Sequence, residues 1–220
     1  MAYTLNIQID SNGVQNIQSA GQWVTIVKPV NAPGQRFHAA GPHVVWCAFI
    51  PQQENQLTWQ KQYWLYETSI QHGIGSIGTT DGPARDGYSY VFEEDFKSPV
   101  NDLAPGSFGV LNRQGANNLS FGLAQAVQVN DDSLPPIPVN VIPVLNNERA
   151  IFQPEETVSV FLSAFFQDFS NPYQNGVVIS EVTGEACTVT LEDNIPVTLS
   201  FDDLTNEFVV LPSSRSPDQL

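Results

Sequence analysis

The stretch Tyr3-Thr-Leu5-Asn-Ile7-Gln-Ile9-Asp alternates apolar and polar residues without a fault. The stretch Ile195-Pro-Val197-Thr-Leu199-Ser-Phe201-Asp, near the other end of the 220-residue chain, does the same. Successive side chains of a β-strand point to opposite faces, so this alternation is typical of a strand with one face in a core and one in water. β-Branched and aromatic residues fill the apolar runs, and 15 Gly with 16 Pro punctuate the gaps. The sequence therefore predicts an all-β protein.

Only residues 52–63, QQENQLTWQKQY, offer a helix candidate. The segment lacks a clear apolar stripe at the helical period, which makes the helical interpretation weak. It does not change the all-β prediction.

The two halves of the chain resemble each other loosely. One similar pair of segments is Ser89-Tyr-Val-Phe-Glu-Glu-Asp-Phe and Thr188-Val-Thr-Leu-Glu-Asp-Asn-Ile. A second pair is Phe108-Gly-Val-Leu and Phe208-Val-Val-Leu. Similar pairs follow in the same order at offsets of roughly 92 to 103 residues. We therefore predict two similar tandem antiparallel β-sandwich domains of a jelly-roll-like kind, residues 1–115 and 116–220, with a loose tail at 213–220. The alternative is a single continuous sandwich or barrel of the whole chain.

The composition and the net charge limit the classes of molecule that the protein can bind. The chain is 41% hydrophobic and 14% charged, as globular proteins are, and its 23 acids against 8 bases give a net charge of −15. Such a surface repels nucleic acid and anionic lipid headgroups. The N-terminal MAYTLNIQID lacks the features of a signal peptide, and the apolar run TVSVFLSAFF is too short to cross a bilayer. We expect a soluble protein without a transmembrane segment, cytoplasmic or non-classically exported, with Cys47 and Cys187 as free thiols.

The stretch HGIGSIG, residues 72–78, matches the G-x-G-x-x-G pattern of dinucleotide-binding proteins. In those proteins a helix begins at the glycines, and the pyrophosphate lies on its free N–H groups. Here TTDGPARDG follows, and its two Gly and one Pro forbid a helix. We therefore expect a twisted β segment and a turn at Gly73, Gly75 and Gly78, and no nucleotide site.

Aromatic residues are distributed unevenly. All four Trp and all three His lie in the first half, and four large aromatics fall within residues 59–66. If one face of this strand is exposed, its rings form a platform that suits the face of a sugar ring. If both faces are covered, the same rings are ordinary core. The predicted ligand-binding residues are Trp59, Gln62, Tyr63, Trp64, Tyr66 and Glu67.

Two further sets of residues have metal-binding chemistry. His38, His43 and His72 together could hold zinc or copper, and Asp81 and Asp86 in DGPARDG could supply oxygen ligands to calcium. Neither spacing is a known ligand pattern. Hydrogen-bonded histidines and Asp-Gly turns explain the same residues more simply, so the sequence predicts no resident cofactor.

The sequence contains no G-x-S-x-G nucleophile motif. It favours a binding protein over an enzyme, with a carbohydrate or another small apolar or polyol compound as the ligand. One alternative is a self-assembling structural or defence protein of the toxin type, a homo-oligomer. The other is a metal-dependent enzyme that uses His38, His43 and His72.

Overall fold

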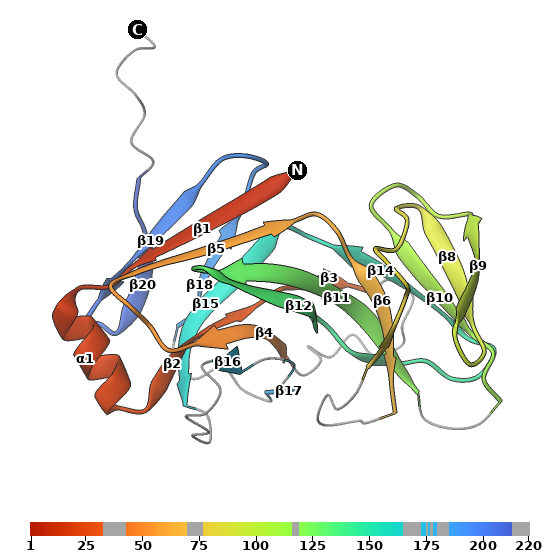
Figure 1. Cartoon of the computed structure of the whole chain (residues 1–220), viewed down its shortest axis with the longest axis horizontal. Helices are drawn as coiled ribbons and strands as arrows, with labels where there is room; N and C mark the ends of the chain where they lie inside the picture. The colour runs from red at the N-terminus through yellow and green to blue at the C-terminus, as the bar shows by residue number, and fades with distance from the viewer. Residues whose placement is uncertain are drawn as a thin grey trace, which may run out of the picture.

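The computed structural model describes residues 1–32, 43–69, 77–115, 119–164, 173–174, 176, 178–179 and 185–212, without the side chains of His43, Gln174, Val178 and Ile179. Strands dominate these residues and only one helix occurs among them, which confirms the all-β prediction. The strands form three sheets (Figure 1).

The largest sheet has nine strands among the described residues, in the order β20-β19-β1-β5-β11-β6-β7, with β12 and β13 also paired to β11. Its strands are β1 (Ala2–Gln8), β5 (Glu54–Gln60), β6 (Trp64–Thr68), β7 (Gly78–Thr79), β11 (Ser120–Val129), β12 (Asp132–Pro138), β13 (Ile142–Pro143), β19 (Val197–Asp202) and β20 (Glu207–Val210). The two alternating stretches of the sequence are neighbours here, because β1 and β19 pair in parallel with Leu5 opposite Val197 and Ile7 opposite Leu199. Leu5, Ile7 and Leu199 are fully buried, as the alternation predicts.

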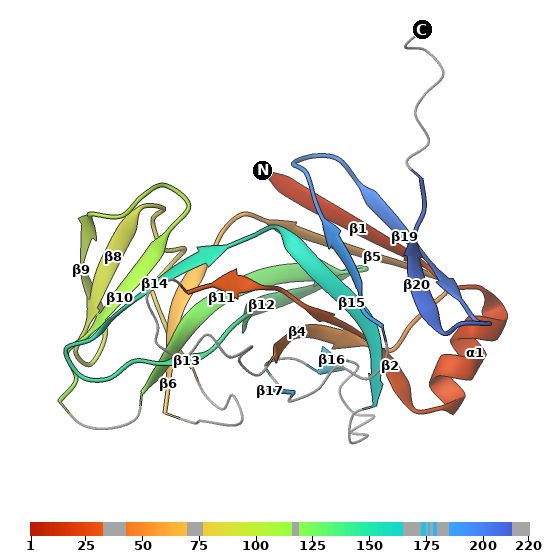
Figure 2. The ribbon, with the colours of Figure 1, turned by 180° about the vertical axis from the view of Figure 1, so that it is seen from behind.

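The other two sheets pack with the first around one core. A six-stranded sheet runs β16-β4-β2-β15-β18 with β17 on β4, and a five-stranded sheet runs β3-β14-β10-β8-β9. The six-stranded sheet contains β2 (Gln22–Val27), β4 (His43–Phe49), β15 (Thr157–Ala164), β16 (Tyr173–Gln174), β17 (Val178–Ile179) and β18 (Cys187–Thr190). The five-stranded sheet contains β3 (Val30–Asn31), β8 (Tyr88–Phe92), β9 (Phe96–Asn101), β10 (Phe108–Asn112) and β14 (Arg149–Pro154). Figure 2 shows β8, β9 and β10 at one end of the molecule and the helix at the other.

The structure does not confirm the tandem duplication. Each sheet combines strands from both sides of residue 115, and one cluster of buried apolar side chains contains residues of all three sheets. The similar segments at 108–111 and 208–211 also pair differently, since β10 lies between β8 and β14 whereas β20 pairs with β19 alone among the described strands. This mixing of strands corresponds to the alternative of one continuous sandwich. The predicted tail, 213–220, lies outside the described residues.

The one described helix, α1 (Ser11–Ser19), was not predicted. Asp10 caps it, accepting a hydrogen bond from the Gly13 N–H at 2.7 Å, and Ile17 is buried on its inner face. The helix candidate at 52–63 is wrong, because most of it is strand β5, in which Asn55, Leu57 and Trp59 are buried in alternation beside β1. No helix in the described ranges is long and apolar enough to cross a membrane.

Candidate functional site

The candidate site is an opening in the largest sheet. Strand β11 pairs with β5 only at Gln128–Thr58 and Val129–Leu57, and with β6 only from Ser120 to Ala124. Between these two pairings the chain turns at 61–63, and the β11–β12 register shifts between Gln125 and Val127. The strands therefore separate and leave a cavity of about 300 Å³.

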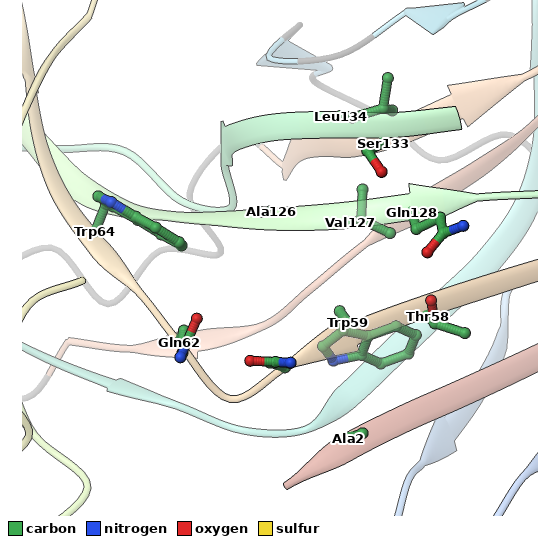
Figure 3. A pocket seen from close by; sticks show the side chains of 11 residues that line it. Ala2, Thr58, Trp59, Gln62, Trp64, Ala126, Val127, Gln128, Ser133 and Leu134 are labelled. Atoms are coloured by element: carbon green, nitrogen blue, oxygen red, sulfur yellow. The ribbon is translucent and has the colours of Figure 1, made fainter. Parts of the chain in front are cut away.

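The cavity combines one half-buried indole with amide and hydroxyl groups. Trp64 and Gln62 lie at the turn that joins β5 to β6, and Gln128 and Ser133 lie along β11 and β12 (Figure 3). Trp64 is half-buried, whereas Gln62, Gln128 and Ser133 are exposed. The lining residues are Ala2, Thr58, Trp59, Gln60, Gln62, Trp64, Ala126, Val127, Gln128, Ser133 and Leu134. None of these side chains carries a charge at neutral pH.

The structure brings three of the six predicted ligand-binding residues together. Trp59, Gln62 and Trp64 line the cavity, although the Trp59 side chain lies largely in the core, with 4% of the residue exposed. Tyr63 and Tyr66 are fully buried and do not line it, and the Tyr66 hydroxyl donates a hydrogen bond to the backbone carbonyl of Asn140. Glu67 lies farther along β6, opposite Phe121, and burial raises the pKa of its carboxyl.

The residues of β11 and β12 that form one wall of the cavity were not predicted from the sequence. Gln128, Ser133 and Leu134 are more than 60 residues from the aromatic cluster in the chain, as the β11–β5 pairing of Gln128 with Thr58 illustrates. No local pattern marks them, because only the pairing of distant strands places them beside Trp64. Their recognition required the tertiary structure.

A buried ion pair lies behind the cavity. Lys28, which follows β2, and Glu156, which precedes β15, approach to 2.8 Å between Nζ and Oε2, with 1% and 7% of their side chains exposed. The Lys28 ammonium also donates to Oε1 of Gln125 at 2.7 Å. It lies 4.9 Å from the ring centroid of Trp46 and 5.1 Å from that of Trp59, distances typical of cation–π contacts.

The Glu156 carboxylate has further partners. It accepts hydrogen bonds from Trp59 Nε1 at 2.9 Å and from the Tyr63 hydroxyl at 2.7 Å. Trp46 Nε1 donates to the backbone carbonyl of Gln125 at 3.0 Å, and no buried side-chain N or O atom of the described residues lacks a partner. A charge buried in this way is tolerated because it is paired and hydrogen-bonded. The two aromatic side chains Trp59 and Tyr63 thus act as donors to a buried carboxylate.

In this network, burial and ion pairing shift the pKa values of Lys28 and Glu156 in opposite directions. Burial lowers the pKa of Lys28 to about 8 even though the Glu156 charge raises it. For Glu156, burial raises the pKa, but the Lys28 charge and the hydrogen bonds from Lys28, Trp59 and Tyr63 outweigh it and hold the pKa below the usual 4.5. Burial is also the main reason why the pKa of the Tyr63 hydroxyl is raised, so this group remains a donor throughout the neutral range.

The lowered pKa of Glu156 predicts a specific loss of stability in acid. Because the folded pKa lies below the unfolded one, this carboxyl contributes stability that is present above pH 4.5 and is lost as the pH falls through the folded pKa. We expect the free energy of unfolding in urea to fall more between pH 5 and pH 3 for the wild type than for Glu156→Gln. Equal losses in both proteins would contradict a paired, ionised Glu156.

Three of the five candidate metal ligands have no described side chain. His38 and His72 lie outside the described residues, and of His43 only the backbone is placed, in β4. Asp81 and Asp86 are exposed, and Asp86 accepts a hydrogen bond from the Gly106 N–H. The part of the chain that the structure describes contains no group of three His, Cys, Asp or Glu side chains that could hold a metal ion. Gly73 and Gly75 also lie outside it, and Gly78 begins β7.

Comparison of the chain with models of known families, with curated proteins and with solved structures found no match.

Proposed function

We propose that the protein is a carbohydrate-binding, lectin-like protein, and that the ligand occupies the cavity beside Trp64. The observation that carries the proposal is the combination of a half-buried indole with the side chains of Gln62, Gln128 and Ser133 around one hollow. A sugar ring has an apolar C–H face that packs on an aromatic ring and hydroxyls at its edge that donate and accept hydrogen bonds. Amide and hydroxyl side chains do both.

The lining also indicates the charge of the ligand. The net charge of the chain is −15, yet the cavity is lined by uncharged side chains. A cationic ligand would be drawn to the acidic surface but would find no carboxylate in the cavity, and an anionic one would be repelled. A neutral sugar fits both facts. The volume of about 300 Å³ is at the lower end of small-molecule sites.

A glycan array with the purified protein, in calcium and in chelator, tests the proposal. We expect binding to neutral glycans that chelator does not weaken, because no carboxylate lines the cavity. Folded protein that binds no glycan in either condition would refute the carbohydrate assignment. Binding that chelator abolishes would move the site away from this cavity.

The Trp64→Ala variant locates the site. We expect it to weaken binding of an array-selected glycan by about tenfold to one hundredfold, as the loss of a central aromatic contact commonly does. Tyr88→Ala is the matched control, because Tyr88 is also a half-buried aromatic but lies on β8 in the five-stranded sheet. Titration calorimetry measures both affinities, and an unchanged affinity in Trp64→Ala would place the ligand elsewhere.

A further inference from the structure

The buried network places three reactive groups in direct contact. The Lys28 amine, the Gln125 carboxamide and the Glu156 carboxyl come from three distant parts of the chain and meet in the core. Trp46, Trp59 and Tyr63 surround the amine, and all three aromatic residues are at most 4% exposed. An amine, an amide and an acid buried side by side are the reactants and the proton carrier of a transamidation.

We propose that Lys28 and Gln125 form a side-chain isopeptide bond, with Glu156 as the group that transfers the protons. The proposal does not depend on what the cavity binds. It makes the core of this protein the site of a self-processing reaction that needs no cofactor and no second protein.

The distances allow the attack. Lys28 Nζ lies 2.7 Å from Gln125 Oε1. Since a carbonyl bond is about 1.23 Å long, Nζ cannot be farther than about 3.9 Å from the Cδ carbon that it would attack. Reacting atoms in near-attack geometry are about 3–3.5 Å apart, so a small rotation of either side chain is enough. Glu156 Oε2 is 2.8 Å from the same nitrogen and can accept its proton.

The reaction balances without another reactant. Glu156 takes one proton from the Lys28 ammonium, and the neutral amine attacks Cδ of Gln125 while the carbonyl π electrons move to Oε1. Glu156 then gives its proton to the amide nitrogen and takes one from the newly bonded Nζ. The carbonyl re-forms as the Cδ–Nε2 bond breaks. The products are a secondary amide, ammonia and protonated Glu156, with no net change in charge.

Burial raises the share of neutral amine, and the leaving nitrogen lies on the side of the network that faces the cavity. Burial lowers the pKa of Lys28 to about 8, so about a tenth of the amine is neutral at pH 7. The leaving nitrogen, Nε2 of Gln125, donates to the backbone carbonyl of Gln60 at 2.8 Å, and Gln60 lines the open cavity. Ammonia would therefore leave toward the cavity.

The bond would join two sheets. Lys28 follows β2 of the six-stranded sheet, and Gln125 lies in β11 of the nine-stranded sheet, 97 residues later. A covalent link over so long a loop restricts the unfolded chain strongly, as a disulfide of the same span does. We therefore expect the cross-linked protein to resist unfolding more than any variant that cannot form the link, whereas the predictions for the Lys28–Glu156 ion pair concern protein in which the link has not yet formed.

Intact-protein mass spectrometry tests the proposal. After incubation at pH 8.5 we expect the denatured wild type to weigh about 17 Da less than its sequence, the mass of ammonia, and tandem spectra to join the peptides that contain Lys28 and Gln125. A wild-type mass equal to that of the sequence would overturn the proposal. A loss of about 18 Da with Glu156 in the cross-linked peptide would also overturn it, because Glu156 would then be the acyl donor rather than the proton carrier.

Three variants separate the roles. Lys28→Arg and Glu156→Gln should keep the mass of their sequences, the first without a nucleophilic amine and the second without a proton carrier. Gln125→Glu should lose water instead of ammonia and reach the same final mass as the cross-linked wild type, which a merely structural role of Gln125 would not produce. Circular dichroism confirms that each variant is folded. A folded Lys28→Arg variant that still shows the ammonia loss would overturn the assignment.

Discussion

Replacing Lys28 by methionine is expected to lower the free energy of unfolding by about 3–5 kcal/mol. The side chains are nearly isosteric, so the packing against Trp46 and Trp59 survives. The Glu156 carboxylate, with 7% of its side chain exposed, loses its cation and stays buried. Removing one partner of a buried pair is costly because the remaining charge is uncompensated.

Urea denaturation followed by tryptophan fluorescence measures this loss. Lys97→Met is the matched control, since Lys97 forms an exposed pair with Glu93 at 3.8 Å, and such pairs contribute about 0–1 kcal/mol. The double variant Lys28→Met/Glu156→Leu should be more stable than Lys28→Met alone, because it removes both charges from the core, but less stable than the cross-linked wild type. If Lys28→Met lowered the free energy of unfolding no more than Lys97→Met does, the Lys28–Glu156 ion pair would not contribute to the stability of the core.

Gly122→Ala is expected to destabilise the protein by about 3 kcal/mol or more, or to prevent folding. A Cβ atom at Gly122 would lie 2.1 Å from the backbone oxygen of Asn140 and 2.6 Å from Cε1 of Tyr66. The Asn140 oxygen belongs to the backbone and also accepts the Tyr66 hydroxyl hydrogen bond, so neither neighbour can move away cheaply. Gly122 therefore allows the Tyr66 ring and the Asn140 carbonyl to cover β11 closely.

The control for this prediction is Gly82→Ala, because a Cβ atom at Gly82 meets no atom within 4 Å. We expect Gly82→Ala to change the melting temperature little and Gly122→Ala to lower it by about 6–12 degrees or more, if the protein folds at all. Similar melting temperatures for the two variants would mean that β11 can shift to admit a methyl group.

Part of the candidate site could be predicted from the sequence. Trp59, Gln62 and Trp64 were predicted to bind a ligand, and they do line one cavity. Trp64 and Tyr66 lie on the same face of β6, so the alternation could not show which of the two rings faces the hollow. In the structure Tyr66 is fully buried and donates its hydroxyl hydrogen bond to the backbone carbonyl of Asn140, whereas Trp64, at the opening, is half-buried.

The sequence alone predicts the two strands with the clearest alternation. The alternation at 3–10 and 195–202 predicts which side chains of β1 and β19 face the core, since the strand period is local and needs no partner. It also determined the acidic charge and the aromatic-rich segment at 59–66. The sequence did not reveal α1, whose capping residue Asp10 is the last residue of the first alternating stretch.

The arrangement of the strands into sheets could be seen only in the tertiary structure. That β1 lies beside β19, that β11 leaves β5 to create the cavity, and that Lys28 meets Gln125 and Glu156 all depend on contacts between residues about 70 to 190 positions apart. Such contacts follow from the burial of complementary faces by the whole chain, and no local sequence pattern encodes the partner. The core network and the opening beside Trp64 are therefore products of topology.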